Sequence, residues 1–298
     1  MSDQIISYHV EGVKARIFAV DSTNTVREAQ KIHQTSHTVT AAFGRMISAA
    51  AMMSLGFKNE KDQITVDIQS EGPVKRMLVV VNAKGEVKGD VAHPQIDLPL
   101  KENGKLDVSL AVGEGTLTVI KDLGLKQPYI GRTPLVSGEI AEDFTKYFAQ
   151  SEQTPSVVAL GVLVDRDGGV LASGGYMIQL LPECEEETIS YIESRLQAVQ
   201  SVSSMIEKDP SLDRIIETIF PDRKSERTSE KGLIYHCDCS KERFARGLVS
   251  LGDEEIDQII REEGQAEIVC HFCKKEYLFD EEELRSIHEK TNKDVDTE

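Results

Sequence analysis

Alternating apolar and polar positions dominate residues 1–181 and predict a β-rich domain. The segments IISYHVEG and VKARIFAVDST have the pattern of paired strands broken at Gly12. Similar β-rich runs, separated by Gly, Asn and Asp, continue from Gln63 to Leu180, including LDVSLAVGEGTLTVIKD, and one helix is expected among them in SGEIAEDFTKYFAQSE. Strands joined by short turns, with a helix or two packed on them, indicate an α+β fold for this domain.

A helical period replaces this alternation in SHTVTAAFGRMISAAAMMSLGF. Apolar residues recur there at spacings of three and four, namely Val39, Ala42, Phe43, Met46, Ile47, Ala50 and Met53. Gly56 can end such a helix. The regular period favours one long core helix for this part of the chain over a methionine-rich binding surface.

The pattern changes after Pro182, and residues 182–231 are expected to form a helical linker. The segment ECEEETISYIESRLQAVQSVSSMIEKD is expected to be helical, with an apolar stripe formed by Ile189, Ile192, Leu196, Val199, Val202 and Ile206. A shorter helix follows, carries Leu212, Ile215, Ile216 and Ile219, and stops at Pro221. The next segment, DRKSERTSEKG, is charged and poor in core residues, which is typical of a linker without regular structure.

Residues 232–298 predict a small C-terminal module that holds most of the cysteines. GLIYHC and AEIVCHFC each have the pattern of a strand that leads into a cysteine pair, and EYLFD can pair with the second of them. Two short helices are expected between the pairs, with Gly252 and Gly264 as their stops.

The four cysteines of this module have the spacing of a zinc site. The chain has five cysteines, of which Cys237, Cys239, Cys270 and Cys273 form a C-x-C and a C-x-x-C pair. Paired thiolates separated by a folded insert supply the four ligands of small structural zinc sites, with neighbouring sulfurs about 3.8 Å apart. A module this short has few large apolar groups, and zinc can contribute about 10–16 kcal/mol to folding.

The cysteine pattern alone leaves two kinds of zinc site open. A closed four-cysteine site can be permanently structural, and it has no free position for hydrolysis. Alternatively, each pair is close enough in sequence to form its own disulfide, although the C-x-C ring is strained, and oxidation then expels the metal. His236 and His271 adjoin the pairs and are weaker alternative ligands, whereas Cys184 stands alone in an acidic segment and is expected to be a bystander.

Composition and charge bear on location and partners. The chain is 40% hydrophobic and 29% charged, which is typical of a globular protein, and has no apolar run that could span a membrane. The first residues lack the pattern of a secretory signal, so a cytoplasmic location is expected, where paired cysteines more often bind metal than form stable disulfides. The net charge of −17 disfavours binding to nucleic acid.

Beyond the cysteines, YFAQSEQTPSVVALGV and GEGTLTVIKDLG followed by PYIGRTPLVSGEIAEDF are similar to segments of the 33-kDa chaperonin family, the redox-regulated heat-shock holdases of bacteria. The chain resembles this family over essentially its whole length. The resemblance implies one Zn²⁺ per reduced chain, bound by Cys237, Cys239, Cys270 and Cys273, and little activity in that state. It also implies disulfides Cys237–Cys239 and Cys270–Cys273 on oxidation, release of zinc, and an active form, often a homodimer, that binds unfolding clients without ATP.

These observations together suggest a mechanism. We expect the stripe from Ile189 to Ile206 to pack on the β-rich domain at rest, held there by the zinc-folded module, and to bind clients when freed. The resemblance further implies that residues 1–181 are a client-binding and dimerisation domain. Two other classes compete: a zinc-ribbon-like module that binds nucleic acid, and a thiol oxidoreductase that uses Cys270-His271-Phe272-Cys273. The oxidoreductase is disfavoured because its C-x-x-C pair should stand at a helix N-terminus, and no other set of residues indicates an enzyme.

Overall fold

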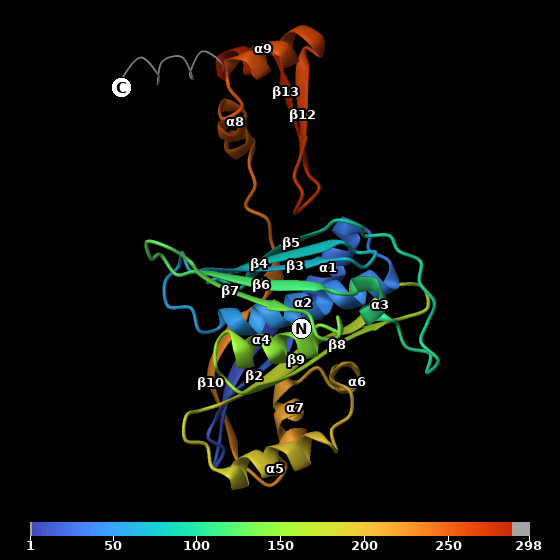
Figure 1. Cartoon of the computed structure of the whole chain (residues 1–298), viewed down its shortest axis with the longest axis vertical. Coiled ribbons are helices and arrows are strands. Elements are labelled where there is room, and N and C mark those ends of the chain that lie inside the picture. The colour runs from blue at the N-terminus through green and yellow to red at the C-terminus, as the bar shows by residue number, and fades with distance from the viewer. Residues whose placement is uncertain (1, 288–298) are drawn as a thin grey trace. The chain divides into compact units, whose positions relative to one another are not determined.

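The computed structural model describes residues 2–287 and divides the chain into two compact units (Figure 1). The first unit comprises residues 1–236, and the second begins at Cys237. The first unit therefore contains both the β-rich region and the segment that follows Pro182.

Two sheets form the body of the first unit. Sheet A has the order β10-β1-β2-β9-β8, with β10 (Ser225–Gly232), β1 (Gln4–Val10), β2 (Ala15–Asp21), β9 (Val170–Leu180) and β8 (Ser156–Val164). Sheet B has the order β11-β5-β4-β3-β6-β7, with β11 (Ile234–Tyr235), β5 (Glu86–Val91), β4 (Arg76–Asn82), β3 (Gln63–Ser70), β6 (Gly115–Asp122) and β7 (Tyr129–Pro134). Neighbouring strands are antiparallel except for β11 and β5.

Helix α2 (His37–Ser54) lies between the two sheets and contacts β8, β9 and β2 of one and β3, β4 and β5 of the other (Figure 1). The predicted core helix is confirmed, but it is buried around nearly its whole circumference, and only His37, Arg45 and Met53 escape full burial. Small residues such as Ala49, Ala50 and Ala51 make this possible, because they let both sheets approach the helix.

Several predicted elements of the first unit need correction. Helix α1 (Thr23–His33) was not expected, because many of its buried positions are polar and hide the apolar period. Helix α3 (Val108–Val112) forms where the sequence indicates a strand, and the Asp107 side chain caps it by accepting from the backbone of Leu110. Helix α4 (Ala141–Gln150) is present as expected, and the α+β class is confirmed.

The segment after Pro182 differs from its prediction in two places. The expected long helix is broken into α5 (Glu186–Leu196) and α6 (Val202–Lys208), and α7 (Leu212–Ile219) follows. The prediction that DRKSERTSEKG lacks regular structure is wrong, because residues Ser225–Gly232 form β10 and pair with β1. This strand has no apolar residue, so no apolar pattern could indicate it. Its conformation is fixed by the backbone hydrogen bonds to β1.

The second unit has its own small core. Strands β12 (Gln265–Val269) and β13 (Glu276–Asp280) form an antiparallel hairpin, and helices α8 (Lys241–Val249) and α9 (Asp253–Glu262) precede it, as expected. The buried members of the core are Leu248, Ile256, Ile260, Ala266, Cys270, Tyr277, Phe279, Leu284 and Ile287. This core is small for an independently folding unit, so a further source of stability is expected there.

Candidate metal centre

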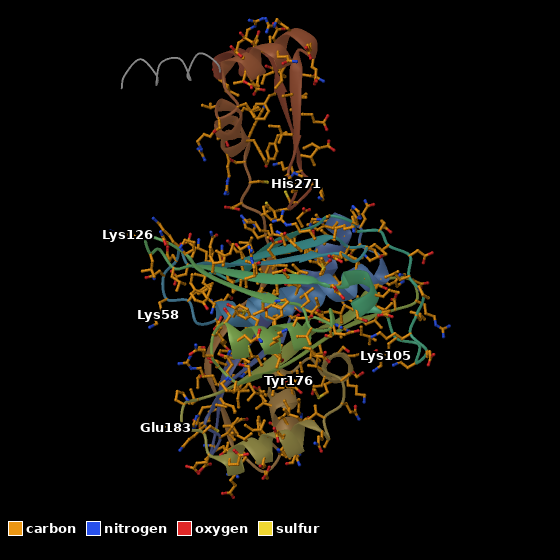
Figure 2. The ribbon with its side chains drawn as sticks, in the orientation of Figure 1. Lys58, Lys105, Lys126, Tyr176, Glu183 and His271 are labelled. Carbon is orange, nitrogen blue, oxygen red and sulfur yellow. The ribbon has the colours of Figure 1, made fainter. Side chains whose placement is uncertain are left out.

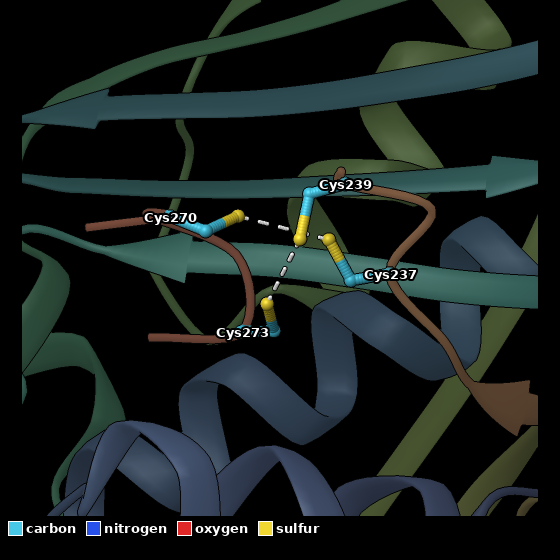
Figure 3. Close-up of side chains that lie close together, drawn as sticks. All are labelled: Cys237, Cys239, Cys270 and Cys273. Atoms are coloured by element: carbon cyan, nitrogen blue, oxygen red, sulfur yellow. Dashed lines mark hydrogen bonds between the residues drawn. The ribbon is translucent and has the colours of Figure 1, made fainter. Parts of the chain in front are cut away.

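The four predicted ligands converge in the second unit (Figure 3). The sulfurs of Cys237, Cys239, Cys270 and Cys273 all lie within 4.8 Å of one another. The Cys237 and Cys270 sulfurs are 3.7 Å apart, and those of Cys239 and Cys273 are 3.3 Å apart. Sulfurs about 3.8 Å apart are what a tetrahedral Zn²⁺ site requires, so the donor set fits this metal in number, type and spacing.

Local structure explains why each pair points inward. Cys270 and Cys273 lie in the turn between β12 and β13, where the Cys270 backbone donates to the carbonyl of Lys275 at 2.9 Å and accepts from Lys274 at 2.8 Å. Lys274 has a φ of 57°, the left-handed conformation that closes such a turn. Cys237 and Cys239 precede helix α8, whose cap Ser240 accepts from the backbone of Arg243 at 3.2 Å.

The thiols of this cluster are unequal. Burial raises the pKa of the Cys237 thiol, and burial also raises the pKa of Cys273 to about 11. At Cys239 burial acts in the same direction, but hydrogen bonds from Tyr277 and Cys273 outweigh it and hold the pKa below its ordinary value. A divalent cation favours thiolates strongly, so metal binding here must displace protons.

The basic residues near the pairs engage other partners. Lys241 forms an ion pair with Glu283 at 2.5 Å, and Arg243 forms one with Asp238 at 3.0 Å. The positive charges of Lys241 and Arg243 are therefore paired with carboxylates. The aromatic Tyr277 is a closer neighbour of the cluster and was not singled out from the sequence.

Tyr277 contacts Cys239 directly. Its hydroxyl oxygen lies 3.1 Å from the Cys239 sulfur and donates to the Cys239 carbonyl, also at 3.1 Å. The ring packs on Phe244 of α8, with centroids 5.0 Å apart. Its alternation with Phe279 in EYLFD places both rings in the core of the second unit and is the sequence signal that could have indicated its role.

The other predicted candidates are placed away from ligand positions. Within residues 2–287, the group that could hold a metal consists of the four cysteines and includes neither histidine nor Cys184. The backbone N–H of His236 donates to Val87 in sheet B at 2.7 Å, and His271 is exposed. The Cys184 sulfur lies 3.9 Å from the carbonyl oxygen of Glu185.

The predicted apolar stripe lies against the outer face of sheet A. Ile192, Val202 and Ile206 are buried in a core shared with β1, β2 and β9, and Leu196 and Val199 pack against it. Ile189 is half-buried. Tyr176 of β9, labelled in Figure 2, belongs to this covered face, and burial raises its pKa to about 12.

Glycines in sheet A let α6 approach closely. A Cβ at Gly161 would stand 2.9 Å from the backbone nitrogen of Ser203 and from a Val202 methyl, and one at Gly174 would stand 2.4 Å from Ile206. Because these two glycines have no side chain, α6 can pack directly on the backbone of sheet A. We call this contact the glycine seat of α6. The stripe is therefore covered in this structure.

These features define a modular protein: an α+β unit carrying covered apolar helices, followed by a small unit with a four-cysteine candidate metal centre. A family profile described as Hsp33 protein matches residues 3–280. A 33 kDa chaperonin of Alkaliphilus oremlandii is 45% identical over 288 residues, covering 96% of each chain. One from Bacillus pumilus is 46% identical over 277 residues, covering 93% of this chain and 94% of the relative.

A solved structure gives the same result. The 33 kDa chaperonin (heat shock protein 33 homolog) of Thermotoga maritima matches 99% of both chains with a TM-score of 0.87 and 36% identity. The chain belongs to the Hsp33 family. It is therefore a chaperone and not an enzyme, which answers the thiol oxidoreductase alternative. Among the described residues, no helix combines the length and apolar character that a bilayer crossing needs.

Proposed function

We propose that this protein is a redox-regulated, ATP-independent holdase that binds unfolding proteins and prevents their aggregation under oxidative and heat stress. The reduced, zinc-bound form is inactive, and the disulfide form is active. The convergence of the Cys237, Cys239, Cys270 and Cys273 sulfurs within 4.8 Å is the observation that carries this proposal. One Zn²⁺ per chain would bind there, and it would supply structural stability in place of reactivity.

The second unit supplies the energetic coupling. Its core is small and includes the ligand Cys270 itself, so loss of the metal removes a large share of its stability. Structural zinc contributes about 10–16 kcal/mol in small modules, more than the total stability of many domains. Oxidation of the ligands therefore unfolds this unit in our proposal.

The disulfides are proposed as Cys237–Cys239 and Cys270–Cys273. In the structure, sulfur contacts at 3.3 Å and 3.7 Å join one pair to the other. The argument for a disulfide within the C-x-C pair and another within the C-x-x-C pair is therefore the short chain between the two cysteines of each pair. This short chain keeps the two thiols close together after the unit unfolds. Peptide mapping of the oxidised protein would reveal which of these pairings forms.

In our proposal, unfolding of the second unit releases the linker, and the released linker exposes apolar residues that bind clients. Residues 182–231 are the proposed redox-sensitive linker, between a client-binding and dimerisation domain (1–181) and a zinc switch domain (232–298). Opening of α5 and α6 would uncover Ile189, Ile192, Leu196, Val199, Val202 and Ile206, together with the sheet face beneath them. The net charge of −17 would keep a client complex in solution and argues against nucleic acid as a partner. A cytoplasmic location, a homodimeric active form and the lack of a membrane partner are further parts of the proposal.

A single set of measurements tests the switch. Zinc content and free thiols are counted before and after peroxide at a mildly denaturing temperature, and light scattering of an aggregating client is followed in parallel. We expect zinc release, loss of four free thiols and suppression of scattering to occur together. Cys184→Ser is the matched control and should behave like the wild type, because Cys184 is outside the cluster.

Two outcomes would contradict the proposal. If zinc stays bound after oxidation, the site is permanently structural. If Cys184→Ser abolishes the response, the sensor thiol lies outside the four-cysteine cluster.

A further inference from the structure

Strand β10 is an unusual edge strand, because none of its residues is apolar. Its sequence is SERTSEKG, and most of its side chains are exposed. It lies at the end of sheet A and pairs there with β1. Charged residues on an edge strand are a common means of preventing the addition of further strands.

Strand β1, the neighbour of β10 in sheet A, has the apolar sequence of a central strand. In its sequence, QIISYHV, the side chains of Ile5, Ile6, Tyr8 and Val10 are all buried. Ile5 belongs to the core between the sheets, whereas Ile6, Tyr8 and Val10 belong to the core on the outer face. An apolar strand of this kind would be prone to strand addition if it stood at an open edge.

The register places polar side chains of β10 opposite apolar side chains of β1. Ile5 is opposite Lys231, Ile6 is opposite Glu230, and Val10 is opposite Ser225. The ladder also shifts between Ser7 and Tyr8. Apolar cross-strand pairs stabilise a sheet better than such mixed pairs. The side-chain contacts between β10 and β1 are polar: the Ser7 hydroxyl lies 2.5 Å from the Thr228 hydroxyl and 2.8 Å from the Ser229 hydroxyl.

A cluster of polar contacts, here called the clamp, fastens β10 to helix α7. The Arg227 guanidinium of β10 donates to both carboxylate oxygens of Asp213 in α7, at 2.8 Å and 2.6 Å. The Tyr8 hydroxyl of β1 donates to the same carboxylate at 3.0 Å. If α7 leaves the sheet, Asp213 leaves with it, and both Arg227 and Tyr8 lose their shared partner.

We propose that release of helices α5, α6 and α7 also frees β10, the strand at the end of the linker, and that the exposed edge of β1 then accepts an extended apolar segment of a client as an added strand. This inference rests on the proposed function. The client forms the backbone ladder that β10 formed, and its side chains replace Lys231, Glu230 and Ser225 opposite Ile5, Ile6 and Val10. The preferred ligand is an uncharged segment with alternating apolar residues, about five to eight residues long.

A peptide pair tests whether the backbone is recognised. A fluorescent peptide of alternating valine and threonine, with terminal lysines for solubility, is titrated into oxidised full-length protein. Its partner has the same side chains but is N-methylated throughout its centre, so neither of its edges can donate. We expect the N-methylated peptide to bind at least about tenfold more weakly. Hydrogen exchange should show protection of Gln4–Val10 by the unmethylated peptide.

Variants of β10 test the location. The double variant Ser225→Val, Glu230→Val gives β10 apolar residues opposite Val10 and Ile6, so β10 should compete better for its own edge. We expect it to weaken peptide binding by about two- to thirtyfold. Glu226→Val is the matched control: it faces the exposed His9 and should leave binding unchanged.

The outcomes separate this inference from the proposed function. If zinc is lost and client aggregation is suppressed, but both peptides bind equally or β1 gains no protection, strand addition is wrong and the proposed function stands. If oxidation neither releases zinc nor suppresses aggregation, the proposed function itself fails. Protection of β1 that grows with protein concentration in the absence of peptide would assign the edge to a second copy of the chain and would also overturn the inference.

Discussion

The seat of helix α6 offers a way to open the linker without touching the cysteines. A Cβ at Gly161 would stand 2.9 Å from the Ser203 backbone nitrogen and from the Val202 methyl, and these contacts are too close for carbon to tolerate. Overpacking of this kind costs about 1–3 kcal/mol. Because the clash is with α6, Gly161→Ala should shift the equilibrium between seated and released linker by about 5- to 150-fold.

The measurement compares hydrogen exchange over Val202–Lys208 in Gly161→Ala and in wild-type protein, both reduced and loaded with zinc. We expect faster exchange in α6, more binding of an apolar dye, and protection of clients under milder stress. Zinc content should not change. Gly56→Ala is the control, because a Cβ at Gly56 meets nothing within 4 Å.

Two results would refute this reasoning. If α6 exchanges at the wild-type rate in Gly161→Ala, the helix is not seated by the glycine. If exchange rises equally in the core between the sheets, the substitution destabilises the whole unit and has no specific effect on the linker.

Three further predictions concern the metal centre and the clamp. Cys270→Ser should abolish stoichiometric zinc binding and unfold the second unit, measured by metal analysis and by exchange in β12 and β13. Tyr277→Phe removes the hydroxyl that contacts Cys239, so zinc should be lost to a competing chelator at about 10- to 100-fold lower chelator concentration; unchanged affinity would show that the contact is incidental. The Arg227 guanidinium holds the pKa of Asp213 below its usual range, so the clamp stabilises the linker above the ordinary aspartate pKa and fails as pH falls through the lowered value. Asp213→Asn should therefore exchange faster in α7 at neutral pH and lose the acid-dependent step that the wild type shows.

The cysteine cluster could be predicted from the sequence because its signal is local. Two short spacings identify the ligands, and a hairpin turn and a helix start then place them. The sequence did not indicate the role of Tyr277, because that role depends on which face of β13 contacts Cys239. A strand pattern shows that side chains alternate between two faces, but it does not show which residues each face contacts. The unequal thiol pKa values likewise depend on burial, which only the folded unit defines.

The fold could be predicted where the pattern of apolar side chains marks the buried face of an element. It could not be predicted where backbone pairing or contacts with residues distant in sequence determine the conformation. The alternation in β1 and β2 and the period in α2 are strong because apolar residues mark the core. The strand β10 has no such mark, because its pairing with β1 decides its conformation. The position of α6 likewise involves a tertiary contact, its close approach to Gly161 and Gly174, which lie far from it in sequence.

Sheet A separates two cores, and this has a consequence for recovery after stress. The core that contains Ile6 and Ile206 lies on its outer face, whereas the core that contains Ile5 and α2 lies on its inner face. In the proposed mechanism, opening of the linker dismantles the outer core and frees β10, whereas the inner core still holds β1, β2, β9 and β8 together with their glycine seat. On this proposal, the helices would refold on an existing surface over a short stretch of chain when reducing conditions return, without a search for the whole fold. The sheet that both cores share would therefore make the proposed switch reversible.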